Sequence, residues 1–115
     1  MGGECGCSEL VLLVDDNSYN VVPVRMGLSK QYGLSLKRAE NGQHAFDMFK
    51  ADMEKTCCDV RFQIILMDLN MPVMGGVEST KLIIEFQNRF LEQVPPSQSY
   101  KYARAPILAM TAFCS

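Results

Sequence analysis

The sequence predicts an α/β domain, in which helices cover both faces of a parallel β-sheet. Four short apolar runs alternate along the chain with three longer segments of helical periodicity. Several of these runs are apolar at consecutive positions, which is typical of strands buried on both faces of a parallel sheet. The helices between them are long enough to serve as the crossover connections that parallel strands need.

The composition is that of one ordinary folded domain. The chain has 115 residues, of which 48% are hydrophobic and 21% are charged, so it is too apolar for a disordered protein. A net charge of −2 provides no positive field for a nucleic-acid backbone, and we expect no nucleic-acid partner. No apolar run reaches the roughly 18 residues of a membrane helix. The first residues do not have the pattern of a secretion signal. We therefore expect a cytoplasmic chain without a membrane segment.

A short leader precedes the predicted domain. Residues 1–8 hold three Gly and two Cys, so we expect a flexible leader, followed by one domain over residues 9–115. The first strand is predicted at residues 10–14, an unbroken run of Leu and Val. Two aspartates follow that run directly.

The first helix is predicted over residues 18–32, where apolar side chains recur at helical spacing. These side chains are Val21, Val24, Leu28 and Tyr32. Pro23 lacks the backbone donor that a helix interior uses, so we expect the helix either to begin near this residue or to bend there. Gly33 is suited to end the helix, because glycine readily adopts the left-handed conformation of a helix cap.

Two more pairs of strand and helix follow. Residues 34–39 and 62–67 are predicted strands, and residues 43–55 and 77–93 are predicted helices. The inward faces of the two helices are expected to be Ala45, Phe46, Phe49 and Met53, then Val77, Leu82, Ile83, Phe86 and Phe90.

The end of the chain changes in composition. Residues 94–104 include two adjacent prolines and several polar side chains, so they are predicted to form a surface loop with nothing to bury. Residues 105–110 are apolar again and are predicted to form the fourth strand.

The five cysteines favour reduced thiols over a metal or redox site. An odd number of cysteines without an export signal is typical of a reducing compartment. One residue separates Cys5 from Cys7, which is closer than the usual spacing of zinc ligands. The single histidine, His44, has no potential ligand nearby in the sequence, and we expect its side chain to be solvated.

Acidic and hydroxyl side chains follow three of the predicted strands. Asp15 and Asp16 follow the first strand, Asp68 the third and Thr111 the fourth. If these strands are neighbours, their carboxyl ends bring the side chains to one edge of the sheet. Three crowded carboxylates repel one another, and a hard cation such as Mg²⁺ relieves that repulsion. Since a carboxylate can also accept a phosphoryl group, the pattern predicts a Mg²⁺ site beside a potential nucleophile.

These side chains lie in stretches that resemble the receiver domains of two-component phosphorelays, the response-regulator family. The string Leu-Met-Asp-Leu-Asn-Met-Pro at residues 66–72 is the most specific part of the resemblance. Asn17 after the aspartate pair is similar to receivers attached to hybrid histidine kinases. The matching stretches are residues 12–17 with Asn20, residues 39–42, residues 65–76 and residues 106–112.

The resemblance implies a flavodoxin-like, doubly wound (βα)5 receiver fold and a role for each site residue. Asp68 would accept a phosphoryl group from a phosphohistidine on a histidine kinase or histidine phosphotransfer protein. Asp16 would bind Mg²⁺ directly, Asp15 would help through a bound water, and the backbone carbonyl of Asn70 would be a further ligand. Thr111 would sense the phosphoryl group. Such a chain is a phosphoacceptor module rather than an enzyme.

The family pattern extends beyond the matching stretches. After Thr111 it continues with a fourth helix, a fifth strand that ends in Lys, and a closing helix, none of which this sequence contains. We expect the chain to be a fragment of a longer product, such as a hybrid histidine kinase. The alternative is a degenerate receiver, which is not phosphorylated and acts as a protein-interaction module. A phosphatase of the haloacid-dehalogenase type is disfavoured, because Asn70 stands where its second carboxylate is needed.

Overall fold

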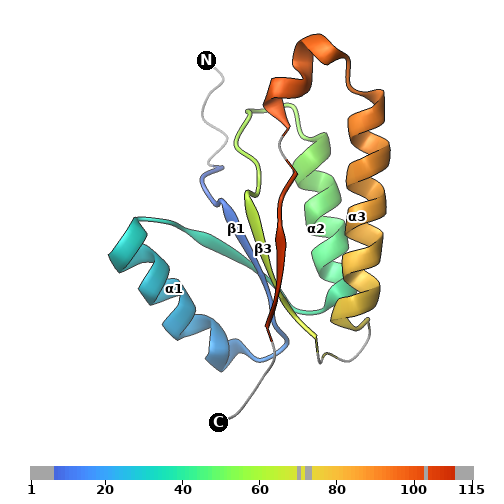
Figure 1. Cartoon of the computed structure of the whole chain (residues 1–115). Coiled ribbons are helices and arrows are strands. Elements are labelled where there is room, and N and C mark those ends of the chain that lie inside the picture. Colours follow the sequence, from blue (N-terminus) through green and yellow to red (C-terminus); the bar gives the residue numbers. More distant parts are fainter. Residues whose placement is uncertain (1–6, 70, 72–73, 103, 111–115) are drawn as a thin grey trace.

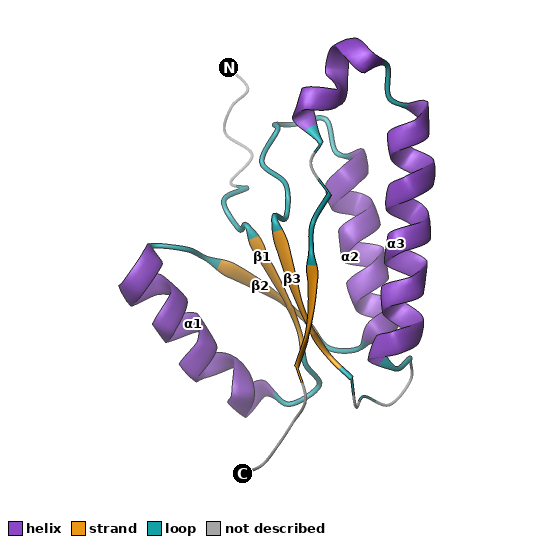
Figure 2. Cartoon of the chain, in the orientation of Figure 1, coloured by secondary structure: helices purple, strands orange, loops and turns teal. Residues whose placement is uncertain are grey.

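Four parallel strands form one sheet between two layers of helices (Figures 1 and 2). The structure, a computed structural model, describes residues 7–69, 71, 74–102 and 104–110. The elements are β1 (Val11–Val14), α1 (Ser18–Tyr32), β2 (Leu36–Ala39), α2 (Gly42–Glu54), β3 (Ile64–Asp68), α3 (Gly76–Gln93), the 3-10 helix η1 (Pro96–Lys101) and β4 (Ile107–Met110). The predicted α/β fold is confirmed, and each strand and α-helix begins and ends within two residues of its predicted position.

The strand order is β2-β1-β3-β4, with every neighbouring pair parallel. The central strand β1 places Val14 beside Ala39 of β2 and beside Met67 of β3. This register aligns the carboxyl ends of β1 and β3, so the residues that follow them meet at one edge of the sheet. In the described part of the chain, β2 and β4 are the edge strands.

Each face of the sheet buries its own apolar core. Leu12 and Val14 of β1 point into the larger core, which α2 and α3 cover. Val11 and Leu13 point into a smaller core under α1. Figure 2 shows α1 on one side of the sheet, and α2 and α3 packed side by side on the other. The consecutive apolar residues of β1 are therefore explained by burial on both faces.

The structure decides between the two alternatives predicted for α1, a start near Pro23 and a helix that includes Pro23. It begins at Ser18 and runs through Pro23, so a late start near the proline is wrong. The side chain of Asn17 caps the helix by accepting a hydrogen bond from the backbone N–H of Tyr19 at 2.9 Å. Gly33 ends the helix at a φ of 65°, as predicted.

Two predicted inward-facing residues lie on the surface. Tyr32 is 68% exposed, and Val77 is 58% exposed. Both stand in a terminal turn of their helix, Tyr32 at the end of α1 and Val77 at the start of α3. Leu82 is only partly buried and is not part of the larger core, whereas the other predicted core side chains of α2 and α3 are buried in it or packed against it.

The segment predicted as a surface loop, residues 94–104, contains the 3-10 helix η1, and residues 95–98 are exposed. It also has something to bury. Tyr102 packs against the larger core, with its ring 5.1 Å from that of Phe90 and 5.2 Å from the Arg61 guanidinium. The Tyr102 ring and a hydrogen bond from Arg104 to the side chain of Asn88 therefore hold this segment against α3.

No helix among the described residues is both long and apolar enough to cross a membrane.

The packing of α3 predicts a difference between two adjacent isoleucines. Ile83 is fully buried in the larger core, whereas Ile84 is 44% exposed. We expect Ile83→Val to lower the free energy of unfolding by about 1 kcal/mol, because it leaves a small cavity. The matched change Ile84→Val should stay within about 0.5 kcal/mol of the wild type. Urea unfolding measures both values, and equal losses in the two variants would contradict this packing.

Candidate functional site

Three carboxylates meet at the carboxyl edge of the sheet. Asp15 and Asp16 follow β1, and Asp68 is the last residue of the neighbouring strand β3. One carboxylate oxygen from each of the three lies within 4.8 Å of the others. The convergence that the sequence predicted for these aspartates is therefore present in the structure.

The three aspartates differ in exposure. Asp15 is 4% exposed and Asp68 is 9% exposed, whereas Asp16 faces the solvent. The cluster thus has an inner wall formed by the sheet and an outer side open to water. Such an arrangement suits an ion that keeps several water ligands.

The backbone around Asp15 is held at both ends. Its N–H donates to the carbonyl of Ala39 at 3.0 Å, and its carbonyl accepts a 3.1 Å bond from Nε of Arg38. Its carboxylate oxygen Oδ1 accepts a hydrogen bond from the backbone N–H of Asn17 at 2.9 Å. The bonds to Ala39 and Arg38 tie the loop after β1 to the end of β2, and the bond from Asn17 fixes the loop itself.

Two glycines bring the neighbouring loops close to the site. A Cβ on Gly76 would meet the backbone oxygen of Asp68 and would lie 2.8 Å from Cα of Leu69. A Cβ on Gly42 would meet the backbone oxygen of Met74 and lie 2.9 Å from its Cγ. Only glycine allows this approach, so the first turns of α2 and α3 press against the loop that follows Asp68.

Ser79 is a supporting residue that the sequence analysis did not single out. It is fully buried on α3, and its hydroxyl donates to the carbonyl of Gly42 at 2.8 Å. The bond joins the first turns of α2 and α3. The signal in the sequence was a small polar residue at helical spacing from the buried Ile83 and Phe86.

Two predicted site residues are not placed by the structure. Asn70 and Thr111 lie outside the described residues. His44 is exposed, as predicted, and its Nδ1 accepts a hydrogen bond from the backbone N–H of Glu40 at 3.1 Å.

The donor set at this edge fits a hard divalent cation. Mg²⁺ takes oxygen ligands, commonly one or two carboxylates together with water. Asp15, Asp16 and Asp68 supply three carboxylates at close range. A cation here would offset the mutual repulsion of the three negative charges.

The comparison with protein families agrees with this geometry. A model described as "Response regulator receiver domain" matches residues 11–95, which run from the start of β1 to just beyond α3. The chain belongs to the response regulator receiver family. It is thus a receiver domain of two-component signalling, and its sheet is that of the flavodoxin-like receiver fold with four strands described.

Related receivers occur in much longer proteins. The chain is 34% identical over 109 residues to the probable histidine kinase 4 of Oryza sativa subsp. japonica, a match that covers 89% of this chain and 10% of that protein. It is 36% identical over 104 residues to the hybrid signal transduction histidine kinase B of Dictyostelium discoideum, with 90% and 5% covered. The receiver therefore spans about a tenth or less of the length of these relatives.

Solved structures share the fold. The receiver domain of the histidine kinase CKI1 from Arabidopsis thaliana, complexed with Mg²⁺ and BeF3⁻, superimposes with a TM-score of 0.70 at 23% identity. That match covers 91% of this chain and 66% of the other. The CheX-CheY-BeF3-Mg²⁺ complex from Borrelia burgdorferi matches with a TM-score of 0.64 at 21% identity, covering 90% of this chain and 61% of the other.

Proposed function

We propose that this receiver is a Mg²⁺-dependent phosphoacceptor of a phosphorelay, and that Asp68 takes the phosphoryl group from a phosphohistidine. The observation that carries the proposal is the meeting of three carboxylates within 4.8 Å at the carboxyl edge of the sheet. A lone carboxylate after a strand is common, but three from two neighbouring strands form a concentrated negative site.

Asp68 is the proposed nucleophile. A carboxylate oxygen attacks the phosphorus atom, the bond from phosphorus to the donor imidazole breaks, and the imidazole leaves with the bonding electron pair. The product is an acyl phosphate on Asp68. Its place at the end of β3, in the rigid sheet, holds the attacking oxygen still while the donor approaches from solvent.

Asp15 and Asp16 are the proposed partners of Asp68 in holding the ion. When bound, Mg²⁺ would offset negative charge on the transferring phosphoryl oxygens. The backbone carbonyl of Asn70 is proposed as a further ligand, and the Thr111 hydroxyl as a hydrogen-bond donor to the phosphoryl group. Both roles rest on the family motif alone.

The proposed donor is a histidine kinase or a histidine phosphotransfer protein. Support comes from the relatives, several of which are named as histidine kinases or hybrid signal transduction histidine kinases. The proposal takes the chain to be a phosphate acceptor and not a turnover enzyme. It also implies a cytoplasmic site, where the ATP that charges histidine kinases is available.

Phosphorylation by a small donor tests the proposal. We expect the purified chain to gain one phosphoryl mass from acetyl phosphate in the presence of Mg²⁺ and none after EDTA, as read by intact mass spectrometry. Asp16→Asn should slow this gain at least about tenfold, because even the loss of a residue that only orients a metal ligand commonly costs 10–100-fold in metal affinity or activity. Asp16 is exposed, so the variant is expected to fold.

The matched control is Asp47→Asn, the same chemical change on the exposed face of α2. This variant should be phosphorylated like the wild type. A folded wild-type chain that gains no phosphoryl group in Mg²⁺ would overturn the proposal and favour the interaction module without phosphorylation.

A further inference from the structure

A second cluster of potential ligands lies where the strands begin, at the end of the sheet opposite the three carboxylates. It consists of three thiols, those of Cys7, Cys57 and Cys58. Cys7 precedes β1, while the other two lie in the connection from α2 to β3. Both segments enter the sheet at the amino ends of their strands, so the cluster is separate from the carboxylates at the carboxyl ends.

The spacing of the sulfur atoms is that of metal ligands. Sγ of Cys7 is 3.7 Å from Sγ of Cys57, which is 3.9 Å from Sγ of Cys58. All three lie within 4.8 Å of one another. A disulfide needs about 2.05 Å between sulfurs. Sulfurs bound at about 2.3 Å to a tetrahedral Zn²⁺ lie about 3.8 Å apart, which agrees with the distances of 3.7 and 3.9 Å between the sulfurs of this cluster.

We propose that Cys7, Cys57 and Cys58 form a binding site for a thiophilic cation, with Zn²⁺ as the natural candidate. Three thiolates supply three of the four ligands of a tetrahedral site, and water takes the fourth position. Soft sulfur ligands select Zn²⁺ or Cu⁺ over Mg²⁺, so the two edges of the sheet would bind different metals. The expectation of reduced thiols without a metal rested on sequence spacing, which does not reveal that residues 7 and 57 are neighbours.

The loop that carries two of the thiols is held in place. Arg61 is 8% exposed and donates from Nη1 to the carbonyl of Cys58 at 2.6 Å and from Nη2 to that of Lys55 at 3.0 Å. Asp52 of α2 accepts a hydrogen bond from the backbone N–H of Phe62 at 2.9 Å. The hydrogen bonds of Arg61 and Asp52 fix both ends of this loop. Two of the three thiols are therefore already ordered before a metal binds, which lowers the entropy lost on binding.

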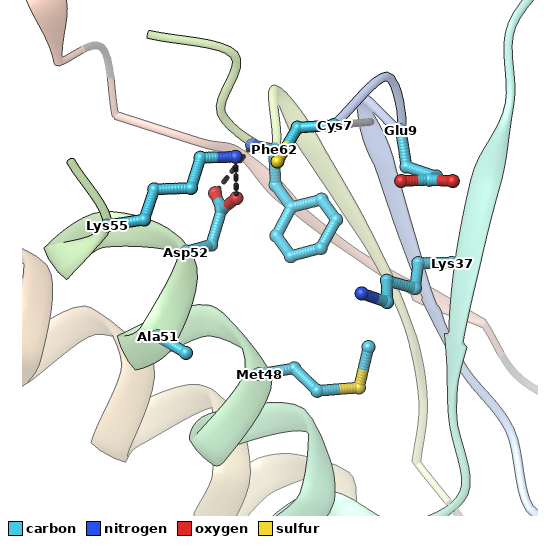
Figure 3. A pocket seen from close by; sticks show the side chains of 8 residues that line it. All are labelled: Cys7, Glu9, Lys37, Met48, Ala51, Asp52, Lys55 and Phe62. Carbon is cyan, nitrogen blue, oxygen red and sulfur yellow. Dashed lines mark hydrogen bonds and ion pairs between the residues drawn. The ribbon is translucent and has the colours of Figure 1, made fainter. Parts of the chain in front are cut away.

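A lysine lies next to the thiols. Figure 3 shows Lys55 and the sulfur of Cys7 on the same side of a pocket of about 210 Å³, with Asp52 paired to Lys55 at 2.9 Å. The ammonium of Lys55 thus lies beside the proposed ligands, with Asp52 as its ion-pair partner.

Metal binding in a chain that keeps only these three cysteines tests the inference. In the double variant Cys5→Ser, Cys114→Ser, we expect one Cd²⁺ per chain to produce an ultraviolet thiolate-to-metal band under reducing, oxygen-free conditions. We expect Zn²⁺ to displace it, and one Zn²⁺ to protect the three thiols from a thiol reagent. Adding Cys57→Ser should weaken binding by at least about 100-fold.

The control in the same background is Thr56→Ser, an exposed neighbour of Cys57, which should bind like the background. Binding that Cys57→Ser leaves unchanged would overturn the inference. A chain that binds no metal but oxidises to a Cys7–Cys57 disulfide would also overturn it and indicate a redox pair. Asp68→Asn should retain the thiolate band, so this result is independent of phosphoacceptor function.

Discussion

Asp68→Asn is expected to abolish phosphoryl uptake, with a loss of at least about 1,000-fold in rate, or about 4 kcal/mol in transition-state free energy. The amide oxygen carries no negative charge and forms no acyl phosphate. The variant also reduces the carboxylates that face the proposed metal from three to two. Intact mass spectrometry after incubation with acetyl phosphate and Mg²⁺ measures the loss.

Stability separates a chemical defect from a folding defect in this experiment. Asp68 stands within 4.8 Å of two other carboxylates, so removing its charge relieves repulsion. We expect Asp68→Asn to unfold at a urea concentration no lower than the wild type. If this variant is still phosphorylated at the rate of the wild type and of Asp47→Asn, another residue is the acceptor.

Gly76→Ala is expected to disrupt the site through the backbone. A Cβ at this position would meet the backbone oxygen of Asp68 and the Cα of Leu69 at 2.8 Å, and neither atom belongs to a flexible side chain. Relief of the clash requires α3 to move away from the end of β3, where the proposed acceptor stands. We expect a loss of about 3 kcal/mol in the free energy of unfolding, together with impaired phosphorylation.

The matched control is Gly27→Ala. Gly27 lies inside α1, and a Cβ there has nothing within 4 Å. Alanine is the better helix former, so this variant should gain about 0.5–1 kcal/mol. Urea unfolding of both variants gives the comparison, and a Gly76→Ala chain as stable as Gly27→Ala would show that the close approach at Gly76 is wrong.

Local pattern was sufficient for most of the fold because it reports burial directly. Consecutive apolar residues in β1 predict two buried faces, and the structure places Leu12 and Leu13 in different cores. The helices followed from side chains at helical spacing. Helix propensity was a weaker guide at Pro23, because a proline disfavours a helix interior. The helix forms through this residue nonetheless, supported by the Asn17 cap and by the burial of Val21 in the smaller core.

Sequence alone therefore determined the alternating elements and placed Asp15, Asp16 and Asp68 at the carboxyl ends of their strands. The strand order of the folded sheet, with β1 beside β3, decided that the three carboxylates meet. The tertiary structure decided what depends on the path of the chain between distant residues. Tyr102 reaches Phe90 and Arg61, and Cys7 meets Cys57 across 50 positions. The physical reason is that a local pattern reports which face of a helix or strand is buried. Contacts between loops depend instead on the order and direction of the packed strands, which bring residues far apart in the sequence close together in space.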